Sequence, residues 1–251
     1  MTNSQNYSVC AESEFLIEKA ENLSKVLGIP FEVEPQTNIQ LMVTENHIEL
    51  RAADLGSPIW IDFIEGKNAH RRKFGGGRGQ ALAKAVSLKH GKTPSIIDCT
   101  AGYGRDAFVL ATLGCQITLI ERNPIIATLL QDALERATND SDTAEIAHRM
   151  ILHNTDAKDY LQALNPQQRP DVIYIDPMYP SRAKSALVKK DMQLLHQIIG
   201  PDTDNGYLLT IAQDIALKRV VIKRPKTAQP LTKQKPSSSI ESKNTRYDIY
   251  I

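Results

Sequence analysis

The stretch from Ser95 to Asp106 (SIIDCTAGYGRD) constrains the fold most, because it joins a strand, a glycine turn and a helix start. Two isoleucines form the apolar run of a short buried strand, and Gly102 and Gly104 allow the backbone to turn sharply. Asp106 precedes a second apolar run, so we predict that it is the N-cap of a helix. The unpaired N–H groups of a helix N-terminus attract anions, and the turn therefore predicts a site for a nucleotide-sized ligand.

Two classes of ligand fit such a turn. Gly102, Gly104 and Ala107 match the loose G-x-G-x-x-A form of the dinucleotide fingerprint. Glu121 follows the next predicted strand, where a carboxylate could bind ribose hydroxyls. This pattern alone also fits a nicotinamide-dependent oxidoreductase. A second motif, DPMY at 176–179, has no role in a dehydrogenase.

From Ser95 onward, predicted strands and helices alternate, which is the pattern of a parallel sheet covered on both faces. We predict strands at 95–98, 116–120, 150–153, 172–175, 208–211, 219–223 and 246–251. We predict helices at 106–113, 124–137, 158–164 and 185–199. The fold class is therefore α/β, with a ligand expected beyond the carboxyl ends of the strands.

Residues 1–66 are predicted to form a small N-terminal α+β subdomain, followed by a second domain at 67–251. A helix is expected over 12–27, a hairpin from 39–43 and 47–50, and a further strand at 59–64. No residue pattern in this segment indicates chemistry.

The formal net charge is only +1, but the basic residues are segregated. Residues 67–92 contain eight Lys or Arg and no acid, and residues 218–251 contain nine against two acids. Two basic segments on an otherwise acidic chain favour a nucleic acid partner; solvated basic loops are the alternative. The first segment includes three successive glycines, which suit either an anion-binding nest or an interdomain hinge. The later segment, from 226 to 242, predicts a mobile basic loop.

The cysteines and histidines do not form the pattern of a metal centre or a disulfide framework. The three cysteines form no C-x-x-C pair, and the six histidines form no H-E-x-x-H motif. The first eight residues are polar, and no apolar run reaches the length of a membrane span. We therefore expect no metal, no membrane association and a cytoplasmic location.

Acidic residues follow four predicted strands at the point where each strand ends. They are Asp98, Glu121, Asp156 and Asp176. Because the carboxyl ends of parallel strands meet at one edge of the sheet, we expect these side chains to lie near one another. A cofactor that contains adenosine would find a ribose acceptor at Glu121 and an acceptor for the adenine amino group at Asp156.

The order of these strand ends resembles that of the class I S-adenosylmethionine-dependent methyltransferases. DPMY is similar to the [DNS]-P-P-[YFW] signature of enzymes that methylate exocyclic amino groups, although Met178 replaces the second proline. Six longer strings resemble the RsmJ family of guanine-N2 methyltransferases of small-subunit ribosomal RNA, in which D-P-M-[FY]-P is the usual form. These strings are FGGGRGQ at 74–80, AGYGRDAFVLA at 101–111, LIERNP at 119–124, DPMYP at 176–180, KSALVKK at 184–190 and TRYDIY at 245–250.

The resemblance implies a class I methyltransferase Rossmann-like sheet with helices on both faces, and S-adenosyl-L-methionine as the cofactor. It implies 16S ribosomal RNA or the small ribosomal subunit as the partner, and methylation of the N2 amino group of one guanine, guanine 1516. Besides Asp98, Gly102 and Gly104 of the turn, matching positions imply cofactor contacts at Arg105, Asp106, Glu121, Arg122, Thr155, Asp156 and Asp176.

The implied catalytic residues are Asp176, Pro177 and Tyr179. The lone pair of a guanine amino group is delocalised into the ring, so acceptors at the Asp176 carboxylate and the Pro177 carbonyl would hold its hydrogens and orient the nitrogen. Tyr179 would stack on the base after it leaves its own stack. The alternative for Asp176 and Pro177 is a simple turn that ends a strand.

Three other functions remain open at this stage. A DNA adenine-N6 methyltransferase would use a similar tetrapeptide, and only a substrate test separates it from an RNA guanine enzyme. An oxidoreductase would use the glycine turn and leave 176–179 without a role. A non-catalytic RNA-binding assembly protein would need the basic segments and would tolerate replacement of Asp176.

Overall fold

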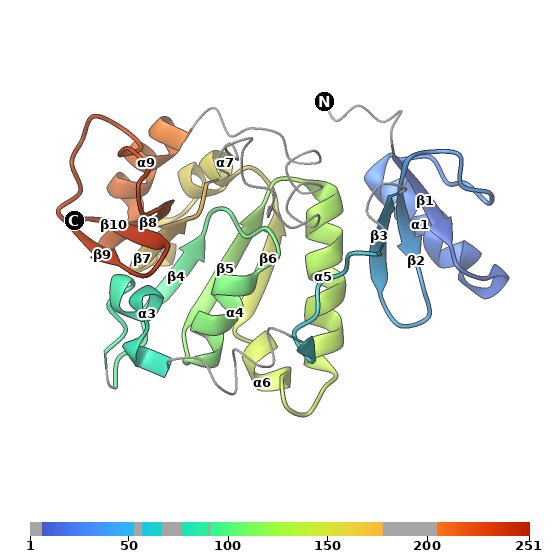
Figure 1. Cartoon of the computed structure of the whole chain (residues 1–251), viewed down its shortest axis with the longest axis horizontal. Coiled ribbons are helices and arrows are strands. Elements are labelled where there is room, and N and C mark those ends of the chain that lie inside the picture. The colour runs from blue at the N-terminus through green and yellow to red at the C-terminus, as the bar shows by residue number, and fades with distance from the viewer. Residues whose placement is uncertain (1–6, 53–56, 67–76, 90, 178–204) are drawn as a thin grey trace.

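The computed structural model describes residues 7–52, 57–66, 77–89, 91–177 and 205–251 (Figure 1). Two sheets lie within these ranges, one of three strands and one of seven. The predicted helix at 185–199, Met178, Tyr179 and the basic residues at 67–76 lie outside the described residues. The division of the chain at residue 66 stays a prediction.

The three-stranded sheet has the order β1-β2-β3. Its strands are β1 (Tyr7–Ala11), β2 (Ile39–Val43) and β3 (Ile48–Ala52), and the predicted hairpin is confirmed as the antiparallel pair β2 and β3. A short 3₁₀ helix, η2 (Glu14–Leu16), leads into α1 (Ile17–Leu27), which packs on β1. The helix ends at Gly28, whose left-handed backbone (φ 63°) forms a C-terminal cap that a glycine adopts without strain.

The seven-stranded sheet has the order β6-β5-β4-β7-β8-β10-β9. Five neighbouring strands are parallel, and they are β6 (Met150–Asn154), β5 (Gln116–Glu121), β4 (Ser95–Asp98), β7 (Val172–Ile175) and β8 (Arg219–Pro225). β10 (Thr245–Tyr250) is antiparallel to β8, and β9 (Ser238–Glu241) is antiparallel to β10. After β4 the chain adds β5 and β6 on one side of it, and it then crosses to the other side of β4, where it adds β7, β8 and the last two strands. The switch point of the sheet therefore lies between β4 and β7, where open sheets of this type bind ligands.

Helices cover both faces of this sheet, as predicted (Figure 1). The strands alternate between the faces, so that Ile96 belongs to one core cluster and its neighbour Ile97 to the other. One face packs against helices that contribute Leu82, Phe108 and Leu129, and the other against helices that contribute Leu161 and Leu209. The first set is α3 (Ala81–Ala85), α4 (Arg105–Thr112), α5 (Pro124–Thr138) and α6 (Ala144–Ala147); the second is α7 (Ala157–Gln162) and α9 (Asn205–Ile215). Short 3₁₀ helices, η3 (Gly77–Gly79) and η4 (Pro166–Gln168), complete the described elements.

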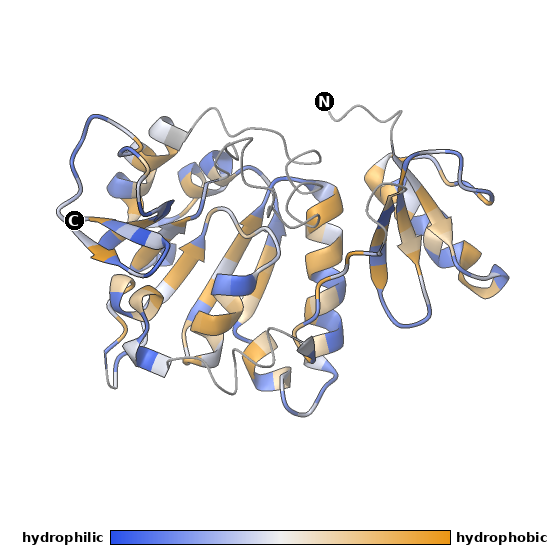
Figure 2. Cartoon of the chain, viewed as in Figure 1, coloured by the Kyte–Doolittle hydropathy of each residue, from blue (hydrophilic) through white to orange (hydrophobic). Residues whose placement is uncertain are grey.

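Apolar residues concentrate on the central strands and on the sheet side of α5 (Figure 2). Asn123 caps α5 by accepting hydrogen bonds from the backbone N–H groups of Ile125 and Ile126, with Pro124 at the first position of the helix. The first core cluster continues without interruption from this face into the three-stranded sheet, where it includes Leu41 and Leu50. The two sheets thus share one hydrophobic core.

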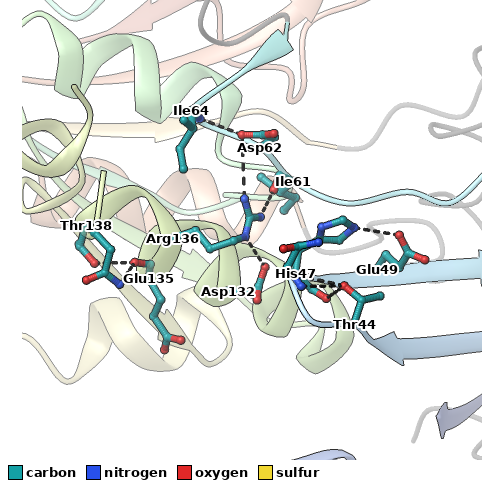
Figure 3. Close-up of polar contacts among 12 residues, drawn as sticks. Thr44, His47, Glu49, Ile61, Asp62, Ile64, Asp132, Glu135, Arg136 and Thr138 are labelled. Carbon is teal, nitrogen blue, oxygen red and sulfur yellow. Dashed lines mark hydrogen bonds and ion pairs between the residues drawn. The ribbon is translucent and has the colours of Figure 1, made fainter. Parts of the chain in front are cut away.

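Polar contacts also join the N-terminal segment to α5 (Figure 3). Arg136 of α5 donates to the backbone carbonyl of Ile61, donates to Asp132 at 2.9 Å and lies 4.0 Å from the carboxylate of Asp62. Nearby, the imidazole of His47 lies 2.9 Å from Glu49 on β3. Helix α5, which packs on the seven-stranded sheet, therefore holds residues 61 and 62, which follow the three-stranded sheet in the chain.

Two predicted strands are wrong. In place of a strand at 208–211 the chain forms α9, because Leu208, Leu209, Ile211 and Ala212 make the buried side of a helix. A short apolar run of this kind does not distinguish a strand from a helix by its periodicity. In place of a strand at 59–64 only Ile59 pairs, with Leu50, because the side chain of Asp62 accepts the N–H groups of Ile64 and Glu65 and turns the backbone.

The basic loop after β8 is more ordered than the sequence predicts. Residues Ser238–Glu241 form β9 at the edge of the sheet, paired with β10 over Arg246 to Ile249. The serines have little strand propensity of their own, but β10 supplies a partner for their backbone groups. The prediction of a mobile loop over 226–242 is therefore wrong for the residues of β9, and for the residues before β9 it stays a prediction.

Gly104, in the turn between β4 and α4, packs closely against α5 and against the N-terminal segment. Its φ is +65°, and a Cβ atom there would lie 2.9 Å from Leu130 of α5 and 3.1 Å from Phe63 of the N-terminal segment. Phe63 also stacks on Phe108 of α4, with ring centroids 4.5 Å apart. Gly104 is therefore needed both for its backbone conformation and for packing.

Replacing Gly104 with Ala should lower the free energy of unfolding by about 3 kcal/mol, from backbone strain and overpacking together. Gly102→Ala is the matched control, since Gly102 also has a positive φ (+51°) but its Cβ would meet nothing nearer than 3.9 Å. This variant should cost about 1 kcal/mol, from strain alone. Urea unfolding of both variants measures the difference; equal losses would mean that the contact with Phe63 and Leu130 does not limit this position.

Candidate active site

The carboxyl ends of the parallel strands bring most of the predicted site residues to one edge of the sheet (Figure 1). Asp98 ends β4, Glu121 ends β5 and Asp176 follows β7 directly. Gly102 and Gly104 lie in the turn between β4 and α4, as predicted. Pro177 is buried next to Asp176. The series of strand ends read from the sequence therefore lies along one edge of the sheet.

A first group of contacts surrounds Glu121, which is buried (5% exposed). Its two carboxylate oxygens accept the backbone N–H groups of Gly102, at 2.9 Å, and of Asn123, at 2.8 Å. Its backbone carbonyl accepts the N–H of Thr155, at 3.1 Å. The acid expected to bind ribose hydroxyls is thus fixed in orientation by the glycine turn and by the backbone N–H of Asn123.

A second group of contacts links Asp98 to Asp176. The backbone N–H of Thr100 donates to Asp98 at 3.1 Å, and the Thr100 hydroxyl accepts the backbone N–H of Asp176 at 2.6 Å. Asp98 is 4% exposed, and burial raises its pKa to about 7. The Thr100 N–H lowers this pKa, while the nearby carboxylates of Asp176 and Asp106 raise it further.

Lys223 of β8 holds two carboxylates at this edge. Its ammonium nitrogen lies 2.7 Å from Asp106 Oδ2 and 2.8 Å from Asp176 Oδ2. The hydroxyl of Tyr174 on β7 also donates to Asp106 Oδ2, at 2.8 Å. Burial raises the pKa of Asp176, and Lys223 offsets part of that rise. Three carboxylates and one ammonium leave this edge with a surplus of negative charge whenever the acids are ionised.

The prediction that Asp106 is a helix N-cap is wrong. Helix α4 begins at Arg105, and its N-cap is Gly104 in a left-handed conformation. Asp106 is therefore the second residue of the helix, and its carboxylate accepts hydrogen bonds from Lys223 and Tyr174. The left-handed glycine starts the helix two residues earlier than the acidic residue suggests.

The remaining predicted residues lie around this edge with different surroundings. Arg105 and Arg122 are exposed, and the guanidinium of Arg105 lies over the ring of Tyr103, 5.1 Å from its centroid. Asp156 is the N-cap of α7, where it accepts the N–H of Lys158 at 2.8 Å. Its role as a cap accounts for its position without a ligand, and its contact with a cofactor stays a prediction. Tyr179 lies outside the described residues.

Sequence reasoning missed Thr100, Tyr174 and Lys223. A signal for Lys223 was present, because the run VVIKRP places a charged side chain at the carboxyl end of a predicted strand, as for the acidic series. Tyr174 carried no signal, since it reads as an ordinary apolar strand residue. Thr100 resembles any turn residue until its contact with Asp176 is known.

This edge fits S-adenosylmethionine. Gly102 carries no side chain, and among the described residues the nearest atom to a Cβ there would be the Thr100 carbonyl oxygen at 3.9 Å, so a ligand can approach the backbone of the turn. The surplus of carboxylates suits a cofactor that carries a sulfonium and an ammonium group, and Glu121 offers acceptors for ribose hydroxyls. Within the described ranges no cluster of His, Cys, Asp and Glu has the arrangement of a metal site. Nor does any helix there combine the length and apolarity that crossing a membrane requires.

Comparisons with known proteins identify the class. The model of the family described as "Putative SAM-dependent methyltransferase" matches residues 23–251. The crystal structure of a SAM-dependent methyltransferase from Neisseria gonorrhoeae is similar to this fold, with a TM-score of 0.78, 33% sequence identity, and coverage of 97% of this chain and 95% of that chain. The fold is that of a class I S-adenosylmethionine-dependent methyltransferase, and S-adenosylmethionine is the cofactor.

Curated relatives define the family more narrowly. A protein of Aeromonas salmonicida is 53% identical over 84% of this chain and 85% of its own length. One of Thioalkalivibrio sulfidiphilus is 45% identical over 97% of each chain. Both carry the name ribosomal RNA small subunit methyltransferase J, and the chain belongs to their family.

The buried carboxyl of Asp98 should make stability depend on pH. Its ordinary pKa is 3.8, so the unfolded chain releases this proton near pH 4, whereas the folded chain keeps it until about pH 7. Between these values the free energy of unfolding falls as pH rises. Asp98→Asn does not titrate, so its stability relative to the wild type should rise by up to about 4 kcal/mol between pH 4 and pH 7.

Chemical unfolding of both proteins at several pH values measures this difference. Asp159→Asn, at an exposed position of α7, is a control for the change in net charge, and its stability should run parallel to that of the wild type. A constant difference between Asp98→Asn and the wild type would contradict the burial of a protonated Asp98.

Proposed function

We propose that this chain transfers a methyl group from S-adenosylmethionine to the N2 amino group of a guanine, guanine 1516, in 16S ribosomal RNA of the small ribosomal subunit. The observation that carries the proposal is Asp176 and Pro177 at the carboxyl end of β7, beside the switch point of the sheet. The names of the curated relatives support ribosomal RNA as the substrate. Action on ribosomal RNA would place the protein in the cytoplasm.

The residues that would hold the cofactor are those of the turn and the neighbouring strand ends. Asp98, Gly102, Gly104, Arg105, Asp106, Glu121, Arg122, Thr155, Asp156 and Asp176 are the proposed set. Glu121 would accept ribose hydroxyls while the turn holds its carboxylate in place. S-adenosylmethionine supplies a methyl group on a positively charged sulfur, ready for transfer to a nucleophile.

Asp176 would position the guanine amino group. Its Oδ2 is bound to Lys223, whereas its Oδ1 accepts no hydrogen bond from the described residues. The Asp176 side chain is 39% exposed, so a substrate can reach it. In this proposal Oδ1 accepts one N2 hydrogen, and the Pro177 carbonyl accepts the other. This pair would turn the nitrogen lone pair toward the methyl group.

Proton removal completes the proposed reaction. On taking the methyl group the N2 nitrogen would become positively charged, and it would then have to lose one of its hydrogens as a proton. The proton passes to the Asp176 carboxylate, which already accepts that hydrogen, and then to water. Tyr179 would stack on the base, as the motif implies.

Methyl-labelled S-adenosylmethionine tests the proposal directly. The purified protein is incubated with small subunits, naked small-subunit RNA and duplex DNA from cells that lack the gene, and labelled nucleosides are identified. We expect N2-methylguanosine in ribosomal RNA. Asp176→Asn should lower kcat by about 100-fold, because the amide offers less charge to orient the amino group and accept its proton.

Asp171→Asn is the matched control, because Asp171 precedes the same strand at its opposite end, where it binds Lys218 at 2.8 Å. It should retain wild-type turnover. Label only in N6-methyladenine of DNA would replace the proposal with an adenine methyltransferase. Absence of label, with Asp176→Asn still functional in cells, would favour a non-catalytic RNA-binding protein.

We also propose that RNA contacts the basic segment that follows β8. This segment leaves the sheet at the same edge as Asp176, and its first turn is held by Arg246, which donates to the carbonyls of Lys226 and Ala228 at 3.1 and 3.0 Å. Lys233 and Lys235 are exposed beyond this turn. The sequence predicts that the basic segment 71–92, of which residues 71–76 and 90 lie outside the described ranges, contacts RNA on the other side of the cofactor pocket.

Replacing Lys233 and Lys235 with Ala should weaken RNA binding and reduce the slope of log K against log salt by about 1 for each lysine. Cofactor affinity should not change. The matched control replaces two exposed lysines of α1, Lys19 and Lys25. An unchanged slope in the first double variant would contradict contact of these lysines with RNA phosphates.

A further inference from the structure

Lys223 lies directly beside the acid that is proposed to hold the substrate. In the parallel pair of β7 and β8, Ile175 is opposite Ile222, so Asp176 and Lys223 are the next residues along the two strands. The ammonium of Lys223 lies 2.8 Å from Asp176 Oδ2, and 27% of its side chain is exposed. The pair therefore faces the same carboxyl edge as the rest of the site.

The ammonium of Lys223 also donates a hydrogen bond to Asp106 Oδ2, at 2.7 Å. Asp106 is 11% exposed and receives a second hydrogen bond from Tyr174, at 2.8 Å. Burial of Lys223 lowers the pKa of its ammonium, but the attraction of Asp176 and Asp106 outweighs this and raises the pKa above its ordinary value. Lys223 therefore stays charged and held in one orientation.

A count of donors and acceptors shows what this pair offers to a ligand. An ammonium has three N–H donors, and Asp106 and Asp176 accept two of them. Among the residues that the structure describes, the third donor of Lys223 has no acceptor. Oδ1 of Asp176 likewise accepts no hydrogen bond there, and Oδ2 retains a second lone pair. Asp176 thus offers two acceptors, Oδ1 and then Oδ2, and the ammonium of Lys223 beside Oδ2 offers one donor.

The Watson–Crick edge of guanine has the complementary order. Its N2–H and N1–H groups are donors, and its O6 atom beside N1 is an acceptor. With the N2 hydrogen on Asp176 Oδ1 and the N1 hydrogen on Oδ2, O6 would lie next to Lys223. Adenine presents its amino group beside an N1 acceptor, so its N1 would face a carboxylate oxygen with no hydrogen between them, which disfavours it.

We propose that Lys223 is a specificity-determining residue, which donates a hydrogen bond to O6 of the target guanine while it orients Asp176. This inference rests on the proposed guanine-N2 activity and adds how the base is recognised. A role limited to neutralising Asp106 and Asp176 is the alternative, and it would not distinguish between bases.

The test compares RNA with guanosine and RNA with 6-thioguanosine at the one nucleotide that the wild type methylates. Sulfur replaces O6 and is a weak acceptor, whereas N1–H and the N2 amino group are kept. The wild type should prefer guanosine by about 10-fold or more in kcat/KM. Lys223→Met should lose most activity on guanosine and show a preference near 1, and Lys223→Gln, which keeps a neutral donor, should be intermediate.

Lys218→Met is the matched control, since Lys218 on the preceding turn forms an ion pair with Asp171 at the opposite end of the sheet. It should keep the wild-type preference. An equal fall on both substrates in Lys223→Met, with the preference intact, would overturn the proposal in favour of a structural role. Equal rates of the wild type on guanosine and 6-thioguanosine would also overturn the proposed hydrogen bond to O6, whatever the variants show. If the wild type methylates no guanine, the proposed function fails as well, and this outcome is distinct from the other two.

Discussion

The contact of one lysine with two carboxylates organises the carboxyl edge of this sheet. Asp98, Asp106 and Asp176 lie close together at this edge, and removing a carboxylate from water costs several kcal/mol before any partner is counted. Lys223 offsets part of this cost at Asp106 and Asp176, and a proton offsets it at Asp98, whose pKa rises to about 7. The edge keeps a surplus of negative charge, which a cationic cofactor can neutralise.

The same contact ties the chemistry to the topology. Lys223 and Asp176 can meet because β7 and β8 are parallel neighbours in register, and Asp106 joins them because α4 starts at the left-handed Gly104. Gly104 in turn packs against Phe63 and Leu130, so the N-terminal segment and α5 support the turn from behind. A core shared by both sheets therefore fixes the geometry of the site.

Much of the fold could be predicted from the sequence. The strands at 95–98 and 172–175 were predicted to the residue, because continuous apolar runs bounded by polar residues leave little choice. The α/β class, the helices on both faces and the small hairpin are confirmed. The errors share a cause: the apolar run at 208–211 belongs to a helix because of the face it packs against, and β9 exists because β10 pairs with it. Both depend on contacts that are distant in the sequence.

The candidate site was predicted to a similar extent. The rule that ligands lie at strand ends identified Asp98, Glu121 and Asp176, which the structure brings to one edge. It did not identify Thr100, Tyr174 or Lys223, because their roles depend on register between strands and on which face a side chain takes. The N-cap prediction for Asp106 was wrong, because Gly104 is the N-cap and Lys223 and Tyr174 contact the Asp106 carboxylate. The contact of Asp106 with the cofactor, which the family resemblance implies, stays a prediction.

The most direct measurement is a crystal structure of this protein with S-adenosylhomocysteine and a short RNA that contains the target guanine. We predict that the cofactor product lies on the Gly102 turn, with its ribose at Glu121, and that the guanine N2 lies within hydrogen-bond distance of Asp176 Oδ1. A guanine bound elsewhere, or a cofactor away from the carboxyl ends of β4 and β5, would contradict this prediction.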